Sequence, residues 1–176
     1  MSSFKMNVLA AALISASTFA VHAADQGSGT VTFTGSIIDA PCSITPQTSD
    51  QVVPLGQVSA ALLADEGSST PQNFSIDLEK CDTTTLKNVT ITFNGSKDAT
   101  NPNLLGITGD AKGAGVVVTD GSGTAITLGT ASTPRLLGTG NNTLLFSAYL
   151  QGNSDVAGSV IPGEFTSVAN FTLAYP

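Results

Sequence analysis

Cysteine and histidine are the first side chains to consider for chemistry in this sequence. Cys42 and Cys81 lie far apart in the chain and lack the CxxC spacing that is typical of redox and zinc motifs. The single histidine, His22, stands close to the N-terminus. Nucleophilic catalysis by serine or cysteine, and histidine-based zinc or copper sites, would all depend on that one residue.

Carboxylate pairs could in principle act as the acid and base of a glycosidase. The neighbouring acids are Asp65 with Glu66 and Asp77 with Glu79. Asp77 and Glu79 alternate with apolar residues, which favours the solvated face of a strand over a catalytic pair. Residues 109–115 are rich in glycine but lack the Gly-Lys-Ser/Thr order of a phosphate-binding loop. We therefore predict no catalytic, cofactor-binding or metal-binding residues, and no enzyme.

The N-terminal segment has the pattern of a secretory signal. Lys5 supplies a basic start, residues 6–16 are apolar, and small residues lead to Ala23. The apolar stretch is too short to span a bilayer as a mature helix. We predict a signal peptide over residues 1–23, and cleavage there would also remove His22. The remaining chain contains no histidine with which to build the sites considered above.

Export has two consequences for the rest of the chain. It places Cys42 and Cys81 in an oxidising compartment, where one disulfide between them is expected. Without Lys5 the chain keeps five of its six basic residues against 13 acids, a net charge of 5 − 13 = −8. This acidity argues against nucleic acid and anionic membrane as partners, and no later segment is apolar enough for direct membrane insertion.

Short alternating segments separated by turn signals dominate the sequence after the signal. Strands are predicted at residues 74–79, 89–93 and 143–151, and a hairpin at residues 116–119 and 124–128. Residues 59–65 form the only convincing helical pattern, one or two turns long. With no repeat or linker, the sequence predicts one all-β domain, either a sandwich or a small barrel.

The start of the exported chain alternates with a period of two residues. One face of this segment would carry Gly27, Gly29, Val31, Phe33 and Gly35. Three glycines make a poor strand alone but suit a backbone that must approach another body closely. The segment is therefore either a strand that inserts elsewhere or the frayed first strand of a complete sandwich.

The C-terminus is a second alternating strand. One face of it would carry Ala169, Phe171, Leu173 and Tyr175, and the chain ends one residue later. An apolar strand at a sheet edge is an aggregation hazard unless something pairs with it. An ordinary monomer would rarely leave such an edge open.

These features together resemble chaperone-usher fimbrial subunits, most closely the major rod subunits of P pili and type 1 fimbriae. The resemblance rests on residues 35–44 around Cys42, on Cys81, on Gly163, and on the closing residues 171–176. It covers essentially the whole exported chain. Any one of these pieces would be a weak signal, but both ends combined with the cysteine spacing are specific.

The resemblance implies an incomplete immunoglobulin-like sandwich that lacks its last strand and is completed by a donor strand from a neighbouring subunit or a chaperone. Residues 24–36 would form the donor extension and residues 37–176 the pilin domain. In the donor strand, Gly29, Val31 and Phe33 would enter the neighbour's groove, with Gly27 and Gly35 at its ends. The acceptor groove and chaperone-recognition strip would comprise Ala169, Phe171, Leu173 and Tyr175, with Gly163 opening the last strand. Cys42 and Cys81 would steady the first strands.

The implied function is a structural subunit of a surface fimbria that supports adhesion to host surfaces. Its partners would be identical or homologous subunits, a periplasmic chaperone and an outer-membrane usher, and it would need no cofactor. The alternative is a self-contained secreted sandwich that binds carbohydrate as a lectin or adhesin. Sugar sites usually present aromatic platforms, and only Tyr149 and Tyr175 offer a ring with a polar tip. Both are predicted strand residues, which favours the fimbrial interpretation.

Overall fold

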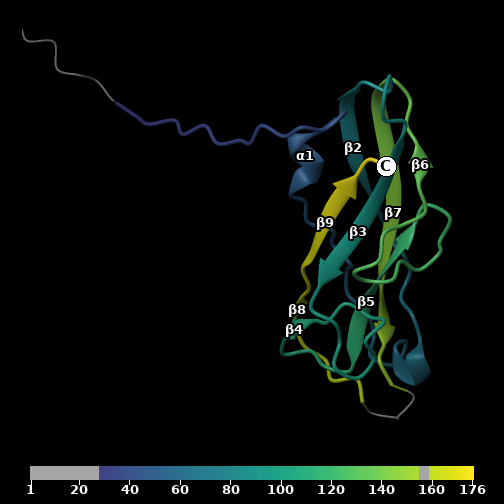
Figure 1. The fold of residues 1–176 in the computed structure, drawn as a ribbon. Helices are drawn as coiled ribbons and strands as arrows, with labels where there is room; N and C mark the ends of the chain where they lie inside the picture. Colours follow the sequence, from purple (N-terminus) through teal and green to yellow (C-terminus); the bar gives the residue numbers. More distant parts are fainter. Residues whose placement is uncertain (1–27, 155–158) are drawn as a thin grey trace, which may run out of the picture. The chain divides into compact units, whose positions relative to one another are not determined.

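The computed structural model describes residues 28–154 and 159–176 and divides the chain into two units, residues 1–37 and 38–176 (Figure 1). The predicted signal peptide and Gly27 lie outside the described residues. In the first unit, residues 28–37 form neither helix nor strand. All helices and strands of the described residues belong to the second unit. Among the described residues, no helix has the length and apolar character needed to cross a membrane.

Two antiparallel sheets contain the long strands of the second unit. The four-stranded sheet has the order β1-β2-β7-β5, and its strands are β1 (Ser43–Ile44), β2 (Gln72–Cys81), β7 (Gly140–Gly152) and β5 (Ala114–Asp120). The three-stranded sheet has the order β6-β3-β9, and its strands are β6 (Arg135–Leu136), β3 (Asn88–Gly95) and β9 (Ala169–Ala174). A short ladder joins β4 (Thr108–Gly109) to β8 (Phe165–Thr166).

The core lies between the two sheets. Alternate residues of three long strands are buried: Ile76 and Leu78 on β2, Val89, Ile91 and Phe93 on β3, and Leu144, Phe146, Ala148 and Leu150 on β7. Phe93 meets Phe146 of the facing sheet edge-on at 5.3 Å between ring centroids, and Phe146 stacks on Phe74 at 5.5 Å. The contact between Phe93 and Phe146 therefore packs the two sheets against each other.

The structure differs from the local predictions at three places. The stretch 59–65 forms tight turns followed by the 3-10 helix η1 (Ala64–Glu66), which ends at Gly67. A four-residue helix, α1 (Pro46–Ser49), carries no such apolar periodicity and was not predicted. The second arm of the predicted hairpin, residues 124–128, is not a strand and has only an isolated bridge between Thr119 and Ala125.

The hairpin arm is replaced by a turn that the side chain of Asp120 organises. Its carboxylate accepts hydrogen bonds from the backbone N–H groups of Ser122 and Thr124 and from the Ser122 hydroxyl, at 2.6–3.0 Å. These bonds to the charged form, the Ser122 hydroxyl first, lower the pKa of Asp120. Local side-chain bonds of this kind compete with a sheet ladder, so the chain leaves the sheet here.

Candidate functional site: the open edge of strand β9

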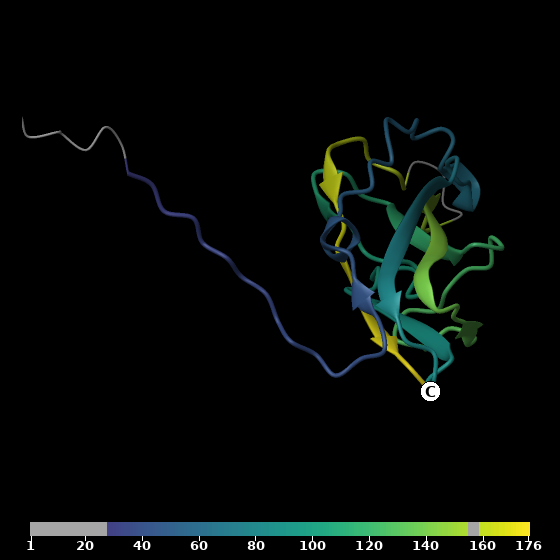
Figure 2. The same ribbon diagram turned by 90° about the horizontal axis from the view of Figure 1, so that it is seen from above.

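Strand β9 is at the margin of the second unit and pairs along one side only (Figures 1 and 2). That side faces β3 in a continuous register from Thr90 opposite Ala174 to Gly95 opposite Ala169. Within the described parts of the chain, no strand pairs with the other side of β9. Alternate backbone N–H and C=O groups of β9 therefore face outward from the sheet edge, where another strand could bind them.

The inward face of β9 packs against the core but is only half-buried. We call its three residues, Ala169, Phe171 and Leu173, together with Tyr175 just beyond the strand, the edge strip. The ring of Phe171 lies 6.3 Å from that of Phe93, so the strip contacts the core directly. On the central strand β7, by contrast, Leu144 and Phe146 are 5% and 2% exposed. The edge strip has the composition of core residues without the burial of core residues.

The pKa of Tyr175 reflects the partial burial of the edge strip. Burial of the ring raises the pKa of the Tyr175 phenol above its ordinary value, since a phenolate is disfavoured beside apolar groups. The residue packs against the core cluster and closes the strip at the C-terminal end.

The chain enters β9 through a break after β8. The Ser167 hydroxyl donates a hydrogen bond of 2.7 Å to the Gly106 carbonyl, and this bond anchors the break. Gly163 lies in a bend before β8, where a Cβ atom would stand 2.6 Å from the backbone nitrogen of Ala111. Gly163 thus permits close packing ahead of the last strands and is separate from the edge strip along the chain.

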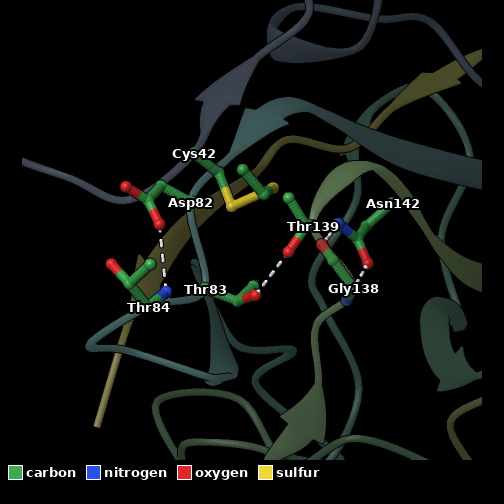
Figure 3. The surroundings of a disulfide bond; sticks show 8 residues. Cys42, Asp82, Thr83, Thr84, Gly138, Thr139 and Asn142 are labelled. Atoms are coloured by element: carbon green, nitrogen blue, oxygen red, sulfur yellow. Dashed lines mark hydrogen bonds between the residues drawn. A yellow bond between two sulfur atoms is a disulfide. The ribbon is translucent and has the colours of Figure 1, made fainter.

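The disulfide between Cys42 and Cys81 is present, as predicted (Figure 3). Both residues are 3% exposed, and the bond ties the start of β1 to the end of β2. Beside it, the Asp82 N–H donates to the Pro41 carbonyl at 2.9 Å. A hydroxyl pair, Thr83 with Thr139 at 2.8 Å, joins this corner to the start of β7. The short edge strand β1 is therefore covalently fixed to its partner strand β2.

The N-terminal segment leaves its large apolar side chains uncovered. Val31 is 74% exposed and Phe33 is 90% exposed, and they stand two residues apart. A Cβ atom added at Gly29 or Gly35 would meet nothing within 4 Å. The chain therefore contains an uncovered alternating segment as well as a half-covered edge strip.

Comparison with known proteins decides the family. The family model described as "Fimbrial protein" matches residues 31–176. This chain belongs to the fimbrial protein family.

The Fimbria A protein of Serratia marcescens is similar to this fimbrial subunit. The two sequences are 58% identical over 154 residues, which cover 88% of each chain. Among solved structures, the P pilus rod subunit PapA has a TM-score of 0.69 and 30% identity over 78% of this chain and all of that one. A chaperone-usher pilus, described in connection with rod uncoiling, gives a TM-score of 0.74 and 33% identity over 86% of this chain and 97% of that one.

These findings confirm the main predictions from the sequence. The protein is a structural fimbrial subunit of the chaperone-usher type, it is located in fimbriae at the bacterial cell surface, and it has the incomplete immunoglobulin-like fold of those pilins. Subunits of this kind assemble with one another.

Sequence reasoning missed three residues that shape the open edge of the fimbrial subunit. The Asn94-Gly95 pair resembles a turn signal, yet both residues end β3 and pair with β9. A Cβ atom at Gly95 would meet the Leu105 side chain and lie 2.8 Å from the Val168 carbonyl oxygen. Ser167 carried no sequence signal, because its hydrogen-bond partner is 61 positions away.

Proposed function

We propose that the open side of β9 accepts the N-terminal segment of a second copy of the chain, and that this strand exchange joins subunits into a fimbria. The observation that carries the proposal is the half-buried edge strip on an unpaired strand, in a chain that also has an uncovered alternating segment. Addition of a strand to an exposed sheet edge is a common mode of peptide recognition. Residues 24–36 act as the donor and the edge strip as the acceptor.

The side chains of the donor match this task. Burial of Val31 and Phe33 against the strip would contribute about 3 to 6 kcal/mol. Backbone hydrogen bonds, each worth about 1 kcal/mol net, add to this before the entropy of ordering the segment is subtracted. Glycine at positions 29 and 35 lets the donor backbone approach the acceptor closely. The joint would open only by local unfolding, which makes the fibre kinetically durable.

Donor and acceptor lie on different parts of the same chain, so each joint leaves one of each free. A heterologous contact of this kind propagates into an open filament unless it closes into a ring. The chain is thus suited to be the repeating rod subunit, with residues 1–23 as the signal peptide, 24–36 as the donor extension and 37–176 as the pilin domain. The rod supports adhesion to host surfaces.

Before assembly the edge strip needs a temporary partner, because an open apolar edge aggregates. A periplasmic chaperone supplies a strand to the same edge, and an outer-membrane usher hosts its replacement by the donor of the next subunit. The similarity to a chaperone-usher pilus supports both partners. The role is structural and involves no catalysis, which agrees with the family and with a predicted exported chain that lacks histidine.

The pairing can be tested with isolated parts. Residues 37–176 are refolded with a synthetic peptide of residues 25–36, and thermal unfolding is followed. The peptide is expected to raise the unfolding midpoint, since it binds only the folded state. A Phe33→Asp peptide should fail because it would bury a carboxylate, while a Thr32→Asp peptide, charged on the opposite face, should still stabilise. Equal effects of the two variant peptides would contradict the proposed orientation.

A further inference from the structure

A hollow of about 390 Å³ lies where strand β5 ends and the turn organised by Asp120 begins. Its lining comes from three segments: Asn73 of β2, residues 145–147 of β7 and residues 120–123 of the turn. Asn73 and Ser147 stand directly opposite each other in the ladder between β2 and β7. Pockets that bind small molecules measure about 300 to 1,000 Å³, so this hollow has room for a ligand of about one ring.

Two glycines keep the turn side of the hollow open. Gly123 has a backbone φ of +85°, which residues with side chains rarely adopt, and a Cβ atom there would meet nothing within 4 Å. A Cβ atom at Gly121 would lie 3.2 Å from the Leu145 carbonyl oxygen, so the turn backbone packs against this strand residue. The Leu145 side chain is nevertheless 56% exposed. The hollow therefore combines a polar turn with an uncovered apolar side chain.

The polar groups of the hollow keep unused hydrogen-bonding capacity. Oδ1 of Asp120 accepts the three bonds that organise the turn, whereas Oδ2 lies 3.7 Å from the Arg135 guanidinium and accepts no hydrogen bond from the described residues. The exposed Asn73 amide also makes none within the described part of the chain. The Ser147 hydroxyl, 2.6 Å from the Thr119 hydroxyl, retains a free lone pair. A ligand in the hollow would therefore meet a carboxylate, an amide and a hydroxyl.

The charges at the hollow restrict the class of ligand. Hydrogen bonds from Ser122 and Thr124 lower the pKa of Asp120, so its carboxylate is ionised at neutral pH and repels anions, as does the formal chain charge of −7. Arg135 beside it disfavours cations. A wholly apolar ligand would bury the Asp120 carboxylate without a new hydrogen bond. An uncharged molecule with several hydroxyl groups and one apolar face satisfies all three conditions.

We propose that this hollow binds a single uncharged sugar ring, whose hydroxyl groups hydrogen-bond with Asp120 and Asn73 and whose C–H face contacts Leu145. A carboxylate accepts from sugar hydroxyls, and an amide both donates to them and accepts from them. The hollow lies on the sheet that lacks β9, so sugar binding is separate from strand exchange. Leu145 offers less contact than an aromatic platform, and each site binds weakly. A fibre would repeat the site in every subunit and so gain avidity, a step that rests on the proposed function.

Saturation-transfer NMR on sheared fimbriae tests the site. The uncharged probes are D-glucose, D-galactose, D-mannose and N-acetyl-D-glucosamine, each free and as its methyl glycoside, which mimics the end of a glycan. N-Acetylneuraminic acid and glucosamine are the anionic and cationic probes. Asp120→Asn keeps an acceptor oxygen for the turn but replaces Oδ2 by an amide nitrogen, and Asn73→Ala removes the amide. The matched control is Asn141→Ala, at an exposed position of β7 outside the hollow.

At least one uncharged sugar is expected to receive saturation from the unmodified chain. Asp120→Asn and Asn73→Ala should each weaken its binding by about fivefold or more, and Asn141→Ala should leave it unchanged. Transfer to the free sugar alone would support a free-sugar ligand, and transfer to the glycoside would support a glycan terminus. Absence of transfer to every uncharged sugar would overturn the inference. Equal binding by all four proteins, or stronger transfer to a charged probe, would also overturn it.

The same fimbriae are run on an unheated denaturing gel to keep this inference apart from the proposed function. All three variants should keep the ladder of multimers, because the hollow is not on the sheet of β9. Loss of the ladder together with the sugar signal would place these residues in the strand-exchange joint and overturn the inference. Absence of a ladder from the unmodified chain would contradict the proposed function alone, since the sugar measurement on the secreted chain would still decide the inference.

Discussion

At the scale of single residues, Tyr175 shows how far the last strand is covered. Its ring packs on the core, and burial raises the pKa of its phenol. An unfolded tyrosine ionises near pH 10, so the folded state favours the neutral phenol more than the unfolded state does. Stability from this group is fully present below about pH 10 and is lost as the pH rises through the higher folded-state pKa.

Tyr175→Phe should therefore reduce the loss of stability in alkali. Phenylalanine packs similarly and cannot ionise, so the variant should lose less unfolding free energy than the unmodified subunit between about pH 9 and pH 11. Urea unfolding of both proteins at the two pH values measures the difference. Equal losses in the two proteins would show that the Tyr175 ring is solvated and that the strip is more open than described.

At the scale of elements, β1 and β9 each lie at one end of their sheet, and they are secured differently. β1 has two residues and one partner strand, and the disulfide at Cys42 compensates for its short ladder. β9 has a six-residue register with β3 but no covalent tie. The fixed edge holds the first strand in place, while the other edge stays available for pairing.

Cys42→Ser is expected to destabilise the pilin domain by about 4 kcal/mol in the chain-entropy account, because the bond closes a loop with a sequence separation of 39 residues. Denaturant unfolding of the peptide-completed domain, with the Cys42→Ser/Cys81→Ser double variant as control, measures the cost. Both variants should lose the same amount, because either change removes the same bond. A loss below about 1 kcal/mol would mean that hydrogen bonds alone secure β1.

Deletion of residues 171–176 should abolish capture by the periplasmic chaperone, because it removes most of the edge strip and its backbone acceptors. Co-purification of the chaperone with the truncated subunit from periplasmic extract is the measurement. A subunit lacking residues 24–36 is the control, since it keeps the strip and should still be captured. Recovery of a stable chaperone complex with the C-terminal truncation would contradict the assignment of the strip.

The sequence predicted β2, β3 and β7 well because each buries mainly one face, and alternation records burial directly. Residues 74–79 and 143–151 fall within β2 and β7 for this reason. Pattern alone did not reveal that β3 pairs with β9, because residues as distant as Thr90 and Ala174 meet only in the folded chain. The loss of the second hairpin arm after Asp120, and helix α1, were not predicted because local hydrogen bonds, not periodicity, decide them. The donor role of residues 24–36 stays a prediction.

At the scale of the whole molecule, the subunit is an incomplete sandwich that carries a candidate for its missing strand in its own sequence. Two segments of the chain expose apolar surface, the uncovered Val31 and Phe33 and the half-buried edge strip. Each segment could bury the apolar surface of the other. When one copy buries the apolar surface of the next in this way, identical joints link the copies into a filament. A filament of this kind needs no energy source to stay assembled, because each joint is stabilised by apolar burial and backbone hydrogen bonds.

The most direct test of strand exchange is an unheated denaturing gel of fimbriae sheared from cells, compared with the same sample after boiling. The account predicts a ladder of multimers of this chain in the unheated lane that collapses to one band on boiling, because the joints open only when the subunits unfold. A single band at the monomer position in both lanes would contradict the account and would favour a self-contained secreted domain.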